Sequence, residues 1–188
     1  MINKVYIAGP FFNSVQLKTI MRLEDLCTAH CSKHYSPRIH SGSADFTPEQ
    51  RASYAAWNQV FNSNVTEIEN TAGPSGCAMI AVLDYQLPEG QSLQLVSENG
   101  AELQEWTQNP VKIYIPDTGT VWEMGAAYML GMQIYGFFPN GKPKAANLML
   151  GHGVSGFYFG WDGLVEDFQD GDFTRYIHPE DAADIRMI

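Results

Sequence analysis

Short apolar runs along the chain are separated by longer segments in which apolar residues recur at helical spacing. The apolar runs are typical of strands, and they lie at residues 4–8, 34–36, 77–83, 112–115 and 133–138. The run at 77–83 is apolar throughout, which is typical of a strand buried on both faces of a parallel sheet. Strands that alternate with helices predict an α/β fold with a parallel sheet and right-handed crossovers.

Two helices are predicted before the central strand. The first begins at Asn13 or Ser14, which are residue types that cap helices. The residues expected on its inner side are Leu17, Ile20, Met21, Leu23 and Cys27. The second helix is expected to begin at Pro48 and to run to about Ile68. A further short helix is expected over the last ten residues, from Pro179.

The segment that begins at Asp117 places two carboxylates, Asp117 and Glu123, six residues apart across the start of a third helix. Gly119 is expected to allow a tight turn there. Thr120 is the expected N-cap, and Gly131 is expected to end the helix. Glu123 would then lie in the first helical turn and face the space that the loop encloses.

Both carboxylates also have structural interpretations. Residues Thr120 to Glu123 have the T-x-x-E spacing of a capping box, in which Glu123 reaches back to the backbone N–H of Thr120. Asp117 can act as a turn or N-cap residue. The functional interpretation is that a carboxylate beside a pocket rich in aromatic residues attacks a sugar carbon.

Ligands of parallel sheets bind beyond the carboxyl ends of the strands. Three features are expected at that edge: the loop Gly9–Phe12 after the first strand, Asp84 after the central strand, and the loop from Asp117 to Glu123. Because acids, aromatic rings and small residues converge there, this edge is the predicted site. Trp57 and Arg38 are further candidates for its lining.

Charge and length narrow the class of protein. The 21 acidic and 11 basic residues give a net charge of −10, which argues against a nucleic-acid backbone or an anionic membrane as partner. A chain of 188 residues with 45% hydrophobic residues predicts one domain, 1–188, with a single core. We find no basic-then-apolar signal segment and no apolar run of membrane-span length, so a cytoplasmic location is expected.

The three cysteines are too few for a disulfide framework and are expected to be reduced. Cys27, His30 and Cys31 share a helix face at a spacing that metal ligands use. No second Cys/His pair of suitable spacing occurs in the sequence, so we expect no metal site.

Four segments together resemble the nucleoside 2-deoxyribosyltransferase family. They are Y-I-A-G-P-F-F at Tyr6–Phe12, Y-S-P-R at Tyr35–Arg38, D-x-G-T-x-x-E-x-G at Asp117–Gly125, and N-L-M at Asn147–Met149. Their order and spacing fit the family across most of residues 3–150. The first and third segments are specific in combination, whereas either alone is a weak signal.

The resemblance implies a flavodoxin-like α/β fold and an obligate homo-oligomer. It also implies an enzyme of nucleotide salvage that exchanges the base of a 2'-deoxyribonucleoside for a free nucleobase. The family works with retention of configuration and without a metal or organic cofactor.

Roles carry over to matching positions of this sequence. Glu123 matches the nucleophile, and Tyr6 matches the tyrosine that positions it. Asp117 matches the acid that binds the sugar hydroxyls. The other matches are Phe12, an aromatic residue of the base pocket, with Gly9 in the same loop, and Asn147 and Met149, which a neighbouring subunit contributes to the site.

The chain departs from the family pattern in two places. The family usually has an Asp near the end of the long helix, where this sequence has Asn64. An amide cannot release a proton near neutral pH, and Glu67, one turn further on, could take over if it faces the pocket. The second departure is an insertion at about residues 85–111, before the active-site loop, which we expect to be a surface excursion near the pocket.

Retention at a sugar carbon needs two displacements: attack by Glu123, a covalent glutamyl-deoxyribosyl ester, and release by a second base. Two alternatives stay open. One is a hydrolytic nucleoside or nucleotide N-glycosidase on the same scaffold, and the other is a non-catalytic nucleotide-sensing module. The loop after the first strand has no Arg and no Gly-rich cradle, so free nucleosides are expected rather than 5'-monophosphates.

Overall fold

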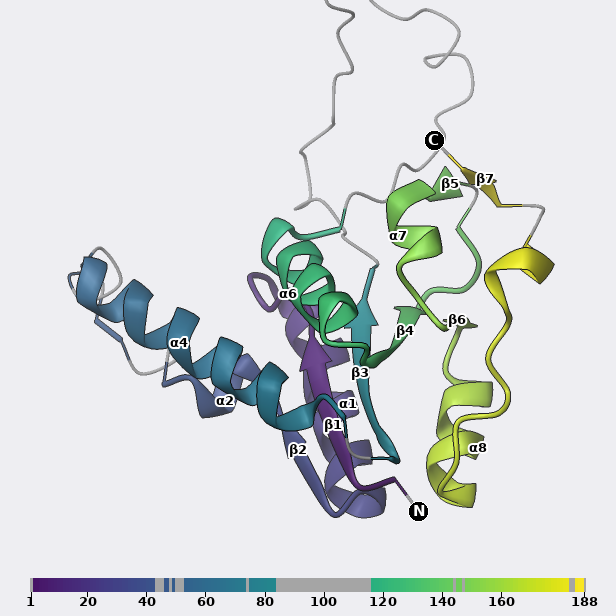
Figure 1. Ribbon diagram of the computed structural model, residues 1–188, viewed down its shortest axis with the longest axis horizontal. Helices are drawn as coiled ribbons and strands as arrows, with labels where there is room; N and C mark the ends of the chain where they lie inside the picture. The colour runs from purple at the N-terminus through teal and green to yellow at the C-terminus, as the bar shows by residue number, and fades with distance from the viewer. Residues whose placement is uncertain are drawn as a thin grey trace, which may run out of the picture.

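Within the described part of the chain, five parallel strands form the main sheet, in the order β2-β1-β3-β4-β6 (Figure 1). The computed structural model describes residues 2–42, 46–47, 49, 53–73, 75–83, 116–143, 145–146, 148–182 and 185–187. The strands are β1 (Lys4–Ala8), β2 (Lys33–Tyr35), β3 (Cys77–Val82), β4 (Gln133–Phe138) and β6 (Gly156–Phe159). This all-parallel order confirms the predicted flavodoxin-like α/β fold.

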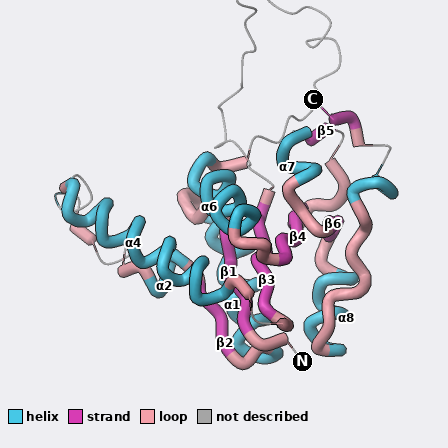
Figure 2. The backbone as a smooth tube through the Cα atoms, in the orientation of Figure 1, coloured by secondary structure: helices cyan, strands magenta, loops and turns pink. Residues whose placement is uncertain are grey.

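Helices cover both faces of the sheet (Figure 2). Helices α1 (Ser14–His30) and α8 (Asp162–Asp170) pack on one face, and α4 (Tyr54–Thr71) and α6 (Thr118–Met129) pack on the other. The shorter elements are α2 (Pro37–His40), α7 (Leu148–His152), the 3-10 helix η2 (Pro179–Ala182), and a second, two-stranded sheet of β5 (Ala145–Ala146) and β7 (Arg186–Met187).

The central strand β3 is buried at every position, as its unbroken apolar run predicts. Successive side chains of a strand point to opposite faces. Met79 and Ala81 accordingly pack in the cluster with α4 and α6, while Ile80 and Val82 pack in the cluster with α1 and α8. In the second cluster Leu23 of α1 is fully buried, and such a side chain contributes roughly 1.5–3 kcal/mol to stability. In the parts of the chain that the structure describes, every helix is too short or too polar to cross a lipid bilayer.

Two expectations about helices are wrong in detail. The inner face of α1 carries Ile20, Leu23 and Cys27 as predicted, but Met21 is 46% exposed. Gln16 and Glu24 are also buried on this helix, and neither is expected there from the sequence. The long helix begins at Tyr54, because Ser53 has an extended backbone and its side chain accepts the N–H of Ala56 at 3.2 Å.

The C-terminal part of the chain contains more regular secondary structure than the sequence pattern predicts. Strand β6 is an edge strand of the main sheet, and helix α8 packs on the same face as α1. Neither element is predicted from the sequence. The helix expected from Pro179 is a single 3-10 turn, which ends at Ala182. Asp84, the insertion at 85–111 and the strand expected at 112–115 lie outside the described residues.

Candidate active site

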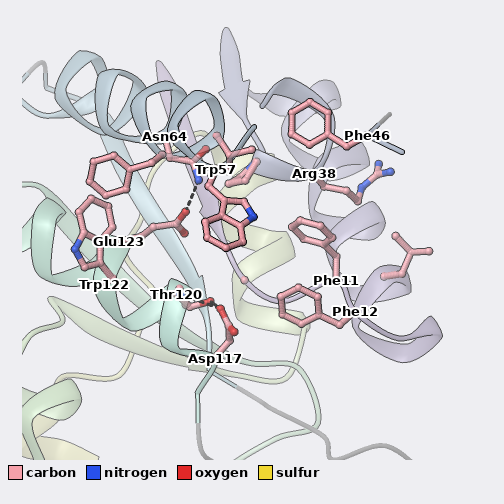
Figure 3. Close-up of a pocket in the computed structure, with 16 residues that line it drawn as sticks. Phe11, Phe12, Arg38, Phe46, Trp57, Asn64, Asp117, Thr120, Trp122 and Glu123 are labelled. Atoms are coloured by element: carbon pink, nitrogen blue, oxygen red, sulfur yellow. Dashed lines mark hydrogen bonds between the residues drawn. The ribbon is translucent and has the colours of Figure 1, made fainter. Parts of the chain in front are cut away.

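A pocket of about 950 Å³ opens at the carboxyl end of β1. Its walls come from the loop after β1, from α2, from the middle of α4 and from the first half of α6 (Figure 3). Strand β1 lies between β2 and β3, so the strand order reverses at this point. Open α/β sheets bind ligands at such a switch point. The predicted edge of the sheet therefore carries the pocket.

Asp117 is the N-cap of α6, and its Oδ2 accepts hydrogen bonds from Thr120 N (2.9 Å) and Thr120 Oγ1 (3.3 Å). The prediction that Thr120 is the N-cap is therefore wrong, and Glu123 lies in the second turn of the helix rather than the first. Gly119 is helical, not part of a tight turn. A Cβ on Gly119 would lie 2.9 Å from Asp117 Oδ2, so glycine leaves room for the capping carboxylate.

Glu123 is 8% exposed and accepts two hydrogen bonds at the same oxygen, Oε1. Tyr6 Oη donates at 2.9 Å from β1, and Asn64 Nδ2 donates at 3.0 Å from α4. Among the described residues, neither oxygen of Glu123 accepts from the backbone of Thr120, so the capping-box interpretation is wrong. No residue in the described part of the chain donates a hydrogen bond to Oε2.

The surroundings of Glu123 favour its protonated form. Burial, and to a smaller degree the negative charge of Asp117, raise the pKa of the Glu123 carboxyl, and the net result of all its surroundings is a pKa of about 7. The hydrogen bonds from Tyr6 and Asn64 act in the opposite direction, because they stabilise the carboxylate. Burial and the neighbouring Glu123 likewise raise the pKa of the Tyr6 phenol, so Tyr6 remains a hydrogen-bond donor at neutral pH.

The loop after β1 brings two phenyl rings to the opposite side of the pocket (Figure 3). A Cβ on Gly9 would lie 2.8 Å from Ile20 Cδ1 and 2.9 Å from Val82 Cβ, which is too close. Glycine therefore allows the backbone at the end of β1 to pack against these two side chains. The side chain of Gln16 accepts the backbone N–H of Phe12 at 2.9 Å. The Phe12 ring is nevertheless 70% exposed, which leaves its face available for stacking.

Aromatic side chains form much of the remaining lining. The aromatic residues of the pocket are Phe11, Phe12, Phe46, Trp57, Phe61 and Trp122. The rings of Phe61 on α4 and Trp122 on α6 pack with centroids 4.9 Å apart, and Trp57 is 60% exposed. Stacking on rings of this kind suits a flat aromatic ligand such as a nucleobase. The pocket thus has an acidic end at Asp117 and Glu123, and aromatic rings line it both there and on the opposite side (Figure 3).

Arg38 lines the pocket, but its charge is already paired. Its Nε donates to Glu24 Oε1 at 3.0 Å, and its Nη2 donates to Glu24 Oε2. Ser36 Oγ adds a bond of 2.6 Å to the same buried carboxylate. The salt bridge raises the pKa of Arg38 further above its usual range. Arg38 therefore lines the pocket as one half of an ion pair.

Glu67 does not face the pocket. Its carboxylate pairs with Lys4 Nζ at 2.6 Å, and it is not among the residues that line the cavity. Its candidacy as a replacement acid for Asn64 is therefore wrong. Among the described residues, no group of three or more His, Cys, Asp or Glu side chains could hold a metal ion.

Comparison with solved structures identifies the fold. A 2-deoxyribosyltransferase from the psychrotolerant bacterium Bacillus psychrosaccharolyticus aligns with a TM-score of 0.60 and 22% sequence identity, over 93% of this chain and 99% of that one. This chain shares its fold. A deoxyribosyltransferase from Leishmania mexicana (TM-score 0.42, 19% identity, 81% of this chain and 73% of that one) and a conserved protein from Enterococcus faecalis (0.38, 14%, 100% and 91%) also match. No protein-family model and no curated protein sequence matches the chain.

The deoxyribosyltransferase-like fold brings most of the predicted site residues together. Those that line the pocket are Gly9, Phe12, Trp57, Asn64, Asp117 and Glu123. Tyr6 lies behind them, fully buried against Glu123. Asn147 and the side chain of Met149 lie outside the described residues; helix α7, which carries Met149, lies on the other side of α6 from α4 in Figure 1.

Sequence reasoning assigns no role to several residues that the structure brings to the site. Trp122 and Phe61 meet only because α4 and α6 pack side by side. Tyr35 donates to Asn64 Oδ1 at 3.0 Å. A signal for Tyr35 does exist: it is the register partner of Tyr6 in the parallel pair β1–β2, so the two rings must share a face of the sheet.

Proposed function

We propose that this protein is a nucleoside 2-deoxyribosyltransferase, which moves the 2-deoxyribosyl group of a 2'-deoxyribonucleoside from one nucleobase to another. The observation that carries the proposal is the setting of Glu123. This carboxylate is buried at the acidic end of an aromatic pocket, and its two donors among the described residues bind the same oxygen. The fold shared with the Bacillus enzyme and the four sequence segments that resemble the family support the same activity.

The first displacement forms a covalent intermediate. Glu123 Oε2 attacks C1' of the sugar on the face opposite the base, and the C1'–N bond breaks. The bonding electron pair leaves with the base, which takes up a proton from solvent as it departs. The product of this step is a glutamyl-deoxyribosyl ester. Tyr6 and Asn64 hold Oε1 while Oε2 reacts, so the nucleophile needs little reorganisation.

The second displacement reverses the first with a new base. A ring nitrogen of the incoming base attacks C1', the ester C1'–O bond breaks, and its electrons return to the Glu123 carboxylate. The incoming base loses its N–H proton. Two inversions give net retention, and no metal or organic cofactor takes part.

The other lining residues hold the substrate. Asp117 uses Oδ2 to cap α6, and its other oxygen is available to accept from sugar hydroxyls. The exposed rings of Phe12 and Trp57 stack on the base. We further propose that the protein is a cytoplasmic homo-oligomer and that Asn147 and Met149 complete the site of a neighbouring subunit. This part of the proposal rests on the sequence resemblance.

The test is a base-exchange assay. Each of the four 2'-deoxyribonucleosides is incubated with each of the other free bases, and the products are separated by chromatography. New β-nucleosides are expected. Free deoxyribose without a new nucleoside would indicate the hydrolase, and binding without any product would indicate the sensing module. Either result overturns the proposal.

Trapping identifies the nucleophile. A 2'-fluoro-arabinosyl nucleoside should leave a covalent adduct on Glu123, detected by peptide mass spectrometry. Glu123→Gln should lower transfer by several powers of ten. Glu69→Gln, a matched change of an exposed acid on α4, should leave transfer unchanged. An adduct on another residue, or an active Glu123→Gln variant, contradicts the mechanism.

A further inference from the structure

Tyr35 lies at the centre of a stack of three rings behind the pocket. Its ring is 6% exposed and packs between Tyr6, at a centroid distance of 5.3 Å, and His40, at 5.1 Å. Both contacts are stacked, with interplanar angles of 25° and 24°. The hydroxyl of this fixed ring donates to Asn64 Oδ1 at 3.0 Å. Tyr35 is therefore held by packing on both faces and has one hydrogen-bonding group aimed at Asn64.

This hydrogen bond fixes which way the Asn64 amide points. An asparagine amide carries an acceptor oxygen on one side and a donor nitrogen on the other. With Tyr35 donating to Oδ1, Nδ2 is turned toward Glu123 Oε1, 3.0 Å away. The opposite orientation would place two acceptor oxygens at that distance, which an ionised Glu123 disfavours.

We propose that Tyr35 is a positioning residue: it locks the Asn64 amide so that Nδ2, together with the hydroxyl of Tyr6, binds Glu123 Oε1 and leaves Oε2 as the reacting oxygen. That Oε2 reacts rests on the proposed function, whereas the locked amide rests on the contacts alone. Asn64 then acts by holding the nucleophile, and it is not a proton donor to the leaving base.

The groups that face Glu123 come from each element packed around it. They are Tyr6 on β1, Asn64 on α4 and Asp117 before α6, with Tyr35 on β2 behind Asn64. Glu67 on α4 is paired with Lys4, and His40 on α2 contacts only the far face of Tyr35 among these groups. The route from Tyr35 to the carboxylate therefore passes through Asn64.

A carboxyl titration tests the locked amide without any assay of activity. The protein is labelled with ¹³C at the glutamate carboxyl carbons, and the signal lost in Glu123→Gln assigns Glu123. Tyr35→Phe keeps the stacked ring and removes only the hydroxyl. It should move the midpoint of Glu123 upward, because a donor to the carboxylate is no longer held in place. Tyr128→Phe, a change to a 60% exposed tyrosine on α6, should not move it.

A double-mutant cycle tests the route. Asn64→Ala should raise the same midpoint more than Tyr35→Phe does. Adding Tyr35→Phe to Asn64→Ala should then change nothing, because Tyr35 acts only through the amide. In the transfer assay, Tyr35→Phe should lower kcat about 3- to 10-fold with KM nearly unchanged, and Asn64→Ala should lower it about 10- to 100-fold.

The outcomes separate this proposal from the proposed function. If the midpoint shifts as expected but the wild-type protein transfers no deoxyribose, the locked amide stands and the proposed function fails. If the wild-type protein transfers deoxyribose but Tyr35→Phe alters neither the midpoint nor kcat, Tyr35 has no positioning role. Additive effects in the cycle would also overturn the proposal, because they would show that Tyr35 acts on Glu123 by a separate route.

Discussion

The hydroxyl of Tyr6 lies 2.9 Å from Oε1 of Glu123, although 117 residues separate the two in the sequence. Tyr6 is on the central part of the sheet and Glu123 is on the helix that covers it, so the bond ties the two layers together at the pocket. A hydrogen bond from a neutral donor stabilises the ionised form of a buried carboxylate. The reactivity of Glu123 should therefore depend both on pH and on this bond.

Activity should increase with pH through neutrality. Only the ionised Glu123 can attack C1', and burial raises the pKa of its carboxyl to about 7. We expect kcat/KM to rise between about pH 6 and pH 8 and then to level off. Tyr6→Phe should lower kcat about 10- to 100-fold and move the rising limb to higher pH, because a bond that lowers the pKa is lost. A profile that is flat from pH 5 to pH 9 would contradict the role of Glu123.

The same carboxyl should make the protein less stable as pH rises. In the folded state it holds its proton up to about pH 7, whereas its usual pKa is 4.5, so between these values only the unfolded state has released the proton. Stability should then fall as pH rises through this window and stay low above it, with a total loss of about 3 kcal/mol. Glu123→Gln removes this dependence while keeping an acceptor for Tyr6 and Asn64.

Urea unfolding at pH 5 and pH 8 measures the effect. The free energy of unfolding of Glu123→Gln, minus that of wild type, should be larger at pH 8 than at pH 5, because only wild type loses stability in this window. Glu69→Gln, with its exposed side chain, should show no such pH-dependent difference. An equal gap at both pH values would show that Glu123 titrates normally in the folded state.

The sequence predicts the parts of the fold whose signals are local. Strands β1, β3 and β4 are short apolar runs because both of their faces are buried, and their predicted bounds agree with the structure to within a residue. Strand β6 escapes prediction because its run of four residues is followed by acidic and aromatic residues that do not alternate. Helix α8 carries a fully buried acid, Asp167, whose partners Tyr158 and Arg175 come from other segments, so its inward face is not apparent from the local pattern.

The site shows the same limit at the level of single residues. Asp117 and Thr120 are both good N-cap types, so composition cannot decide between them. Asp117 can act as the N-cap because Gly119 has no Cβ, which would otherwise clash with the Asp117 carboxylate. The contacts of Tyr35 with Asn64 and of Phe61 with Trp122 depend on strand register and helix packing, which no single segment encodes.

Asp117 should show separable structural and functional effects. Asn is as good an N-cap as Asp, so Asp117→Asn should leave the stability nearly unchanged, whereas Asp117→Ala should lose about 1 kcal/mol through the lost cap to Thr120. Both variants remove the carboxylate that we expect to bind the sugar, so both should raise KM for the deoxynucleoside. Thermal unfolding and steady-state kinetics on the same samples separate the two effects. If Asp117→Asn is fully active and only the destabilised Asp117→Ala loses activity, Asp117 acts only as a helix cap and does not bind the sugar.

Free nucleosides should be better substrates than their 5'-monophosphates, for an electrostatic reason. A phosphate would bring between one and two negative charges into a pocket that already holds Asp117 and Glu123. Two unit charges about 6 Å apart near a protein surface repel by roughly 3 kcal/mol, or about 100-fold in rate. The positive charge of Arg38, at the pocket wall, is bound by the buried Glu24 and so offers the phosphate little compensation.

Glu24→Gln tests this explanation directly. Replacing the carboxylate by an amide leaves the charge of Arg38 without its counter-ion, so kcat/KM for the monophosphate should rise relative to that for the nucleoside. Glu166→Gln removes an acid of the same type on α8, where the wild-type side chain pairs with Arg175, and should not change the ratio. The discrimination should also weaken as salt is added, because exposed charges are screened. Equal kcat/KM for the nucleoside and its monophosphate in the wild-type protein would show that the acidic end of the pocket does not select against phosphate.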